Sequence, residues 1–243
     1  MTQNIYDDPG FFAGYSQLPR SVHGLEAAPE WPALRAQLPD MTGLRVLDLG
    51  CGFGWFCRWA AQQGAAWVRG VDVSDRMLDR ARRETAELAV TYAQADLERF
   101  EIAPGSIDLA YSSLAFHYLE NLGGLLKTIH AALTPGGRIV FSVEHPIFTA
   151  PSKPGWSESA AGTPVWPLDS YLSEGPRITD WLAEGVVKQH RTIGAYLRLL
   201  IEAGFAPRWL EEWGPDAAQI SKHPDWAKER ERPAFLLVAA DRP

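Results

Sequence analysis

The chain has 243 residues, of which 46% are hydrophobic and 22% charged, as in soluble globular proteins, and we predict a single domain over residues 1–243. Its net charge of −7 argues against a nucleic-acid partner, which usually needs a basic face, and two cysteines cannot form a disulfide framework. No apolar run approaches about 18 residues and the first residues lack a signal-peptide pattern, so we expect a cytoplasmic protein without a membrane partner.

Residues 1–40 are predicted to form an N-terminal arm and a helix. The first 23 residues combine aromatic side chains with glycine and proline, which favours an irregular arm. A helix is predicted over residues 24–38, with Pro29 and Pro32 near a break or in its first turn.

From Leu44 onward, short apolar runs alternate with amphipathic segments. This alternation predicts a parallel, doubly wound sheet with right-handed crossovers and helices on both faces. Strands are predicted at 44–49, 66–74, 89–96, 106–114 and 137–144. Helices are predicted at 55–64, 75–86 and 121–133.

The alternation stops after the fifth strand, in an insertion over residues 145–185 that is rich in Pro, Gly, Ser and Trp. Its tryptophans argue against disorder, so we expect a substrate cap without clear periodicity. A helix at 192–205 and strands at 207–213 and 234–242 are predicted to follow.

The stretch VLDLGCGFGW, residues 46–55, resembles a nucleotide-binding turn but departs from the phosphate-binding patterns. A dinucleotide fingerprint needs a glycine where Trp55 stands, and a P-loop needs a Gly-Lys-Ser/Thr ending that is missing here. A NAD-linked oxidoreductase is therefore kept only as an alternative.

Three aspartates stand near the carboxyl ends of the first three predicted strands. Asp48 precedes the first glycine of the loop by two residues, a position that suits a cation better than a pyrophosphate, although it could instead bond loop amides. Asp72 follows Gly50 by 22 residues, the spacing at which a carboxylate meets ribose hydroxyls, and Asp96 ends the third strand. The pattern predicts a ligand that has a ribose, carries positive charge and lacks phosphate.

Five motifs in order resemble those of class I S-adenosylmethionine (SAM)-dependent methyltransferases over about residues 44–143. The motifs are VLDLGCGFG, GVDVSDRML, AQADLE, IDLAYSSLAFHYLEN and LTPGGRIVFS, and the late segments AGF and FLLVAA also fit the family. The resemblance implies a Rossmann-like sheet of seven mostly parallel strands with the last one antiparallel. It also implies a methyltransferase that uses SAM as its methyl donor.

The same resemblance implies the cofactor-binding residues. Asp48 would lie near the ammonium group of SAM, Asp72 would hold the ribose hydroxyls, and Asp96 would accept from the adenine amino group. Met77, a core residue in the alternative interpretation, would pack on the adenine. The full implied set is Asp48, Gly50, Cys51, Gly52, Asp72, Val73, Met77, Asp96, Leu97 and Ser112, flanked by Ser113 and joined by the arm residues Tyr15 and Arg20.

The acceptor is expected to be a small molecule, because the motif typical of base-amine methylation is replaced by YSSLAFHY. A general base is needed only if the acceptor must lose a proton, and His145, then His117, are the candidates, with purely structural roles as the alternative. Substrate contacts are predicted for Glu144, His190, Trp156, Trp166 and Trp181.

No metal is expected, since only Asp108 and Asn121 could begin a carboxylate and amide cluster. A SAM-binding protein without methyltransferase activity is the second alternative. The sequence leaves the oligomeric state open, with a homodimer as one option.

Overall fold

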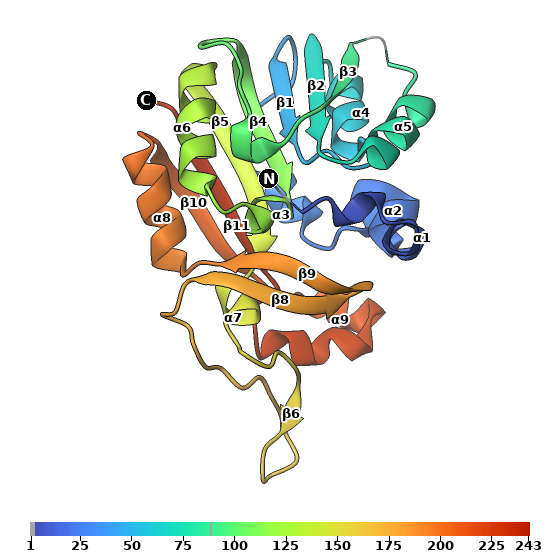
Figure 1. The fold of residues 1–243 in the computed structure, drawn as a ribbon, viewed down its shortest axis with the longest axis vertical. Helices are drawn as coiled ribbons and strands as arrows, with labels where there is room; N and C mark the ends of the chain where they lie inside the picture. The colour runs from blue at the N-terminus through green and yellow to red at the C-terminus, as the bar shows by residue number, and fades with distance from the viewer. Residues whose placement is uncertain (1–2, 88) are drawn as a thin grey trace.

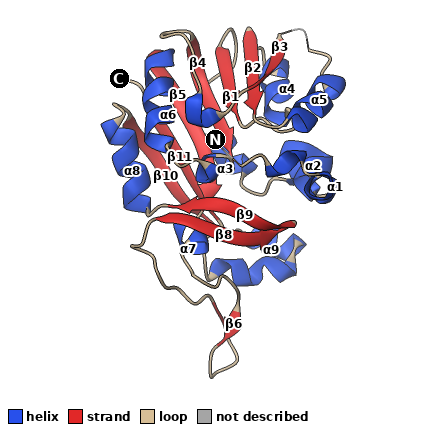
Figure 2. Ribbon diagram, viewed as in Figure 1, coloured by secondary structure: helices blue, strands red, loops and turns tan. Residues whose placement is uncertain are grey.

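The computed structural model describes residues 3–87 and 89–243, which are built around a seven-stranded sheet (Figures 1 and 2). The strand order is β10-β11-β5-β4-β1-β2-β3, and β11 runs antiparallel to both of its neighbours. The other pairs are parallel. The predicted sheet with its antiparallel last strand is therefore confirmed. The strands are β1 (Arg45–Leu49), β2 (Trp67–Asp72), β3 (Val90–Gln94), β4 (Ile107–Ser113), β5 (Leu133–Glu144), β10 (Ala206–Trp213) and β11 (Phe235–Asp241).

The sheet has a switch point between β1 and β4. The chain proceeds from β1 outward to β3 and then returns to the other side of β1 as β4. In open α/β sheets the loops diverge at such a point, which leaves a crevice at the carboxyl ends of the strands. The glycine loop after β1 therefore starts directly at this crevice.

Helices cover both faces of the sheet, as predicted. Alternation along β1 sends Leu47 and Leu49 to one apolar cluster and Val46 to the other. The first cluster packs under α6 (Leu122–Ala132) and α8 (Ile193–Glu202). The second packs under α3 (Trp31–Arg35), α4 (Trp55–Gln62) and α5 (Asp75–Glu84). No helix in the described part of the chain is long and apolar enough to cross a membrane.

The N-terminal arm is helical, so the predicted irregular arm is wrong. Asp8 caps α1 by accepting a hydrogen bond from the backbone N–H of Phe11, and prolines occupy the first turns of α1 and α2. The predicted helix over 24–38 is divided, because Ala28 before Pro29 is extended. The segments are η1 (Ile5–Asp7), α1 (Pro9–Tyr15), α2 (Pro19–His23) and η2 (Gly24–Ala27), followed by α3.

The insertion also contains more regular structure than predicted. It holds α7 (Pro146–Thr149) and a small hairpin of β6 (Ser157–Glu158) and β7 (Pro164–Val165). A longer antiparallel hairpin joins β8 (Gly175–Trp181) to β9 (Ala183–His190). Figure 1 shows this hairpin crossing the end of the sheet, with α1 and α2 beside it and α7 and α9 (Ala217–Lys222) below it; η5 (Pro224–Arg230) follows α9.

A candidate active site at the carboxyl edge of the sheet

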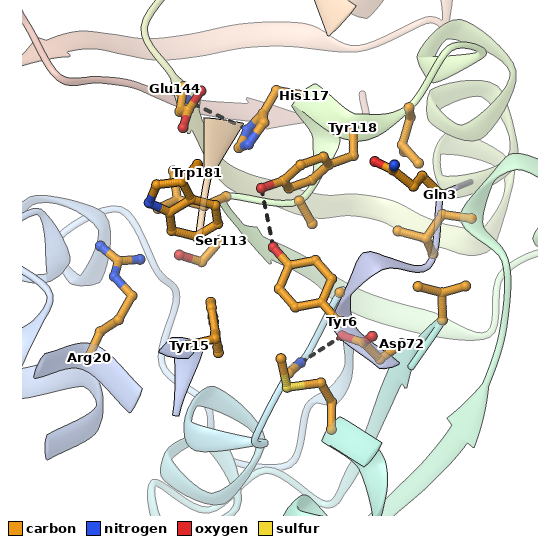
Figure 3. A pocket seen from close by; sticks show the side chains of 18 of the residues that line it. Gln3, Tyr6, Tyr15, Arg20, Asp72, Ser113, His117, Tyr118, Glu144 and Trp181 are labelled. Atoms are coloured by element: carbon orange, nitrogen blue, oxygen red, sulfur yellow. Dashed lines mark hydrogen bonds between the residues drawn. The ribbon is translucent and has the colours of Figure 1, made fainter. Parts of the chain in front are cut away.

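A pocket of about 280 Å³ lies where the sheet edge, the N-terminal arm and the β8–β9 hairpin meet. This volume is close to the lower end of small-molecule sites, which span about 300–1,000 Å³. Side chains from the ends of β2, β4 and β5 and the glycine backbone after β1 converge there with Tyr6 and Tyr15 of the arm and Trp181 of the hairpin (Figure 3). The predicted crevice is therefore closed over by two segments that lie far apart in the sequence.

The glycine loop approaches the pocket with its backbone. Gly50 has φ +75°, and a Cβ atom there would collide with the Cβ of Ala115. Gly52 has φ +52°, and a Cβ atom there would meet nothing within 4 Å. Both glycines line the pocket, so the loop needs Gly50 for packing and leaves open space above Gly52.

Asp72 closes β2 and faces the same space. Its Oδ2 accepts a hydrogen bond from the backbone N–H of Gly52 at 2.9 Å, and its Oδ1 accepts from that of Ser74 at 2.9 Å. Burial raises the pKa of this carboxyl group, although the backbone N–H donors act in the opposite direction. The carboxylate thus ties the glycine loop to the end of β2 while bordering the pocket.

The other predicted cofactor residues divide into two groups. Val73, Met77 and Leu97 line the pocket, and Leu97 begins η3 (Leu97–Arg99). Cys51 is buried outside the lining, and the Oδ1 of Asp96 accepts from the backbone N–H of Glu98.

Asp48 and Ser112 lie beneath the pocket surface. The thiol of Cys57 donates to Asp48 Oδ2 at 3.2 Å, and burial raises the pKa of Asp48 to about 7. Ser112 donates its hydroxyl to the carbonyl of Leu49 at 2.7 Å, whereas the next residue, Ser113, lines the pocket.

The arm is fastened to the hairpin and to Tyr118, which follows β4. Gln3 donates to the carbonyl of Gly185 at 2.9 Å and accepts from the backbone N–H of Val187 at 3.0 Å. The hydroxyls of Tyr6 and Tyr118 lie 3.2 Å apart. These contacts close the pocket from the side opposite to the sheet.

Tyr15 and Arg20, the two arm residues predicted from sequence, both line the pocket. The Nη2 of Arg20 donates to both carboxylate oxygens of the buried Glu30, at 2.9 and 3.1 Å. The Arg20 guanidinium is therefore held in place before any ligand binds. The ring of Tyr15 packs edge-on against Trp181.

His117 lies at the other end of the pocket from Asp72 (Figure 3). It is in η4 (Phe116–Tyr118), and its Nδ1 accepts a hydrogen bond from the backbone N–H of Glu144 at 3.3 Å. Burial lowers the pKa of His117 to about 4, so the ring is neutral at pH 7. With Nδ1 accepting, the proton of the neutral ring is on Nε2, which makes His117 a donor rather than a base.

Glu144 ends β5 beside His117 and also lines the pocket. Its Oε1 accepts from Lys188 Nζ at 2.6 Å, and Lys188 is almost fully buried. Its Oε2 is buried without a hydrogen-bond partner among the residues that the structure describes. Lys188 belongs to β9, and its Nζ lies 5.4 Å from the centre of a ring of Trp181, in the same hairpin.

His145 and His190 are turned away from the pocket. His145 follows Glu144 and points elsewhere, with Nε2 2.9 Å from Glu212 Oε1 and Nδ1 accepting from the backbone N–H of Ile147. His190 is held by the Thr149 hydroxyl and the carbonyl of Tyr171, each at 2.8 Å. Neither histidine is among the lining residues.

Two of the three predicted tryptophans also lie outside the pocket. Trp156 and Trp166 pack edge-on against each other, and the guanidinium of Arg232 lies 5.2 and 4.2 Å from their ring centres. Trp181 alone lines the pocket.

Sequence reasoning missed several lining residues, and only some carried a signal. Tyr118 directly follows His117 in a motif already singled out. Gln3 and Tyr6 belong to the arm, whose position no local pattern fixes. The missed lining residues are Gln3, Tyr6, Leu18, Leu114, Ala115, Tyr118, Leu119 and Phe235.

The sequence and the fold of this chain are similar to those of known proteins. Residues 47–141 match the model of a methyltransferase domain family. An S-adenosylmethionine-dependent methyltransferase from Mesorhizobium loti is 56% identical, with 90% of this chain and 100% of that chain aligned and a TM-score of 0.88. A solved structure from Listeria monocytogenes is 39% identical, with coverage of 89% and 99% and a TM-score of 0.81.

A third relative matches over a shorter segment. Malonyl-[acyl-carrier protein] O-methyltransferase from Erwinia pyrifoliae is 41% identical over 100 residues, which are 41% of this chain and 37% of the relative. The similarity thus spans less than half the length of either protein.

Proposed function

This chain belongs to the class I S-adenosylmethionine-dependent methyltransferases, and we propose that it methylates a small molecule held in the pocket at the carboxyl edge of its sheet. The observation that carries the proposal is the pocket itself, which has two dissimilar ends. One end is formed by the glycine loop and Asp72, and the other by His117, Glu144 and Trp181. The two ends would place a nucleoside and an acceptor next to each other in one space.

The first end fits the methyl donor. The open space above Gly52 admits a ligand against the backbone, and Asp72 offers carboxylate oxygens to ribose hydroxyls. Val73, Met77 and Leu97 supply an apolar surface for the adenine. When bound there, SAM supplies a methyl group on a positively charged sulfur.

Arg20 would meet the carboxylate of the methionine part. Its side chain already pairs with the buried Glu30, which fixes the guanidinium and partly offsets its charge. Asp48 lies behind the loop, so its effect on a bound ammonium group would be exerted through the loop rather than by contact.

The second end supports transfer to a small acceptor by in-line displacement. The arm and the hairpin enclose the acceptor and exclude water, and His117 donates a hydrogen bond from Nε2 to orient it. Alignment of two bound reactants can lower a barrier by about 7–11 kcal/mol, so positioning alone accounts for much of the expected rate.

The malonyl-[acyl-carrier protein] relatives do not define the acceptor for this chain. The similarity to the Erwinia pyrifoliae protein covers 41% of this chain and 37% of that protein. Family membership favours SAM over NAD as the cofactor, and the alternative without methyltransferase activity has no supporting observation.

Calorimetric titration with S-adenosylhomocysteine tests the donor site. Asp72→Ala should weaken binding by about 1–3 kcal/mol through the loss of charge-assisted hydrogen bonds. Asp79→Ala, at an exposed position of α5 where the carboxylate pairs with Arg82, is the matched control and should bind normally. Unchanged affinity in a folded Asp72→Ala variant would contradict the donor site. Release of S-adenosylhomocysteine over a panel of small acceptors then tests the transfer.

A further inference from the structure

The carboxylate of Glu144 has one oxygen that the protein leaves unsatisfied. Oε1 is bound to Lys188, while Oε2 is buried without a hydrogen-bond partner among the described residues. A buried polar atom without a partner costs about 1–3 kcal/mol, so a ligand that supplied a partner to Oε2 would recover that cost. Glu144 lines the acceptor end of the pocket, which identifies the missing partner as a hydrogen-bond donor.

Aromatic rings surround the same end of the pocket. Tyr6, Tyr118 and Trp181 line the pocket, as does Phe235, which pairs with Glu144 in the sheet. Ring faces attract cations by about 0.5–2 kcal/mol, more when the cation is desolvated. Rings together with a carboxylate are the surroundings that a protonated amine favours.

The charges near the pocket point in the same direction. Arg20, the cation of the lining, pairs with Glu30, and Lys188 behind Glu144 pairs with Glu144 itself. The lining itself carries two carboxylates, Asp72 and Glu144, and one guanidinium, Arg20. His117 adds no charge at neutral pH. A carboxylate acceptor would bring a further negative charge beside Glu144.

We propose that the acceptor is an amine, bound as its ammonium form by the free Oε2 of Glu144 between the rings of Trp181 and Tyr6. This inference rests on the proposed function, because it assigns the substrate class of the same pocket. A hydroxyl acceptor fits less well, because an alcohol gives up its proton to a carboxylate such as Glu144 far less readily than an ammonium group does, and the neutral ring of His117 donates with Nε2. A deprotonated amine already carries the lone pair that attacks.

The reaction balances with these groups alone. One ammonium proton passes to the Glu144 carboxylate, which frees the nitrogen lone pair. The nitrogen then forms a bond to the methyl carbon while the carbon–sulfur bond breaks and its electron pair stays on sulfur. The product leaves as a methylated ammonium ion, and the proton on Glu144 passes to water.

Binding of matched probes tests the inference without relying on turnover. We would titrate the protein, saturated with S-adenosylhomocysteine, with 2-phenylethylamine, 2-phenylethanol and phenylacetate, and with the benzyl and n-butyl amines, alcohols and carboxylates. Ligand-observed NMR measures such weak dissociation constants. Wild type should bind the amine of at least one series ten or more times more tightly than its carboxylate.

Variants assign that preference to Glu144. Glu144→Gln should reduce it below threefold, as should Glu144→Gln combined with Lys188→Met, which avoids leaving Lys188 buried and unpaired. Lys188→Met alone should keep the preference, because Glu144 remains. Retained affinity for S-adenosylhomocysteine and an unchanged melting temperature in the double variant exclude misfolding.

Each other outcome overturns the inference. Tightest binding of an alcohol or a carboxylate, an amine preference that survives Glu144→Gln, or binding of none of the probes would do so while the proposed function stands. Failure of S-adenosylhomocysteine itself to bind would instead overturn the proposed function, and the inference with it.

Discussion

Gly52→Ala should affect cofactor binding more than the stability of the fold, and Gly50→Ala is its matched control. Both glycines have positive φ, where an alanine costs about 1–2 kcal/mol. A Cβ at Gly52 meets no protein atom within 4 Å, whereas one at Gly50 collides with Ala115. Overpacking adds about 1–3 kcal/mol, so Gly50→Ala should lose roughly 2–5 kcal/mol of unfolding free energy.

The main effect of Gly50→Ala should therefore be on unfolding free energy, and that of Gly52→Ala on ligand affinity. Gly52→Ala should unfold only about 1–2 kcal/mol more easily than wild type, yet bind S-adenosylhomocysteine at least tenfold more weakly, or about 1.4 kcal/mol, because its methyl group enters the ligand space. Urea unfolding measures the first quantity and calorimetry the second. Wild-type affinity in Gly52→Ala, or equal stability of the two variants, would refute the reasoning.

Three further predictions concern Asp48, His117 and two tryptophans of the insertion. Burial raises the pKa of Asp48 to about 7, so the stability that its protonated form contributes is fully present below pH 4 and is lost as the pH rises through 7. Between pH 5 and 8, wild type should therefore lose about 2–3 kcal/mol more unfolding free energy than Asp48→Asn. Equal losses in the two proteins would contradict this. Because the His117 ring is neutral and donates a hydrogen bond, the pH–rate profiles of wild type and His117→Gln should run parallel from pH 5.5 to 8.5. An acidic limb near pH 6–7 that is present in wild type and absent in the variant would show that His117 acts as a base. Trp166→Ala should lower the free energy of unfolding by about 2 kcal/mol and leave acceptor affinity unchanged. Trp181→Ala should weaken acceptor binding. Weaker acceptor binding in Trp166→Ala and unchanged binding in Trp181→Ala would contradict these roles.

The sheet and the donor end of the site were predictable because their signals are local. Strand length, the glycine turn and the spacing from Gly50 to Asp72 all lie within about 30 residues. The arm carried local signals as well, since Asp8 followed by a proline is a helix start. The aromatic composition of the arm concealed this pattern.

The acceptor end was not predictable in the same way, because it depends on side-chain direction and long-range packing. Glu144 and His145 are neighbours, and alternation sends only one of them to the pocket. The sequence does not say which one, and His145 instead meets Glu212, 67 residues away. Trp181 reaches the pocket only because the hairpin folds back over the sheet edge and contacts the arm.

A crystal structure with S-adenosylhomocysteine bound tests the central claim most directly. The account predicts that the ribose hydroxyls lie within hydrogen-bond distance of Asp72 and that the sulfur faces the space bordered by His117 and Glu144. A ligand bound elsewhere, or a sulfur directed away from Glu144, would contradict the assignment of this pocket to methyl transfer.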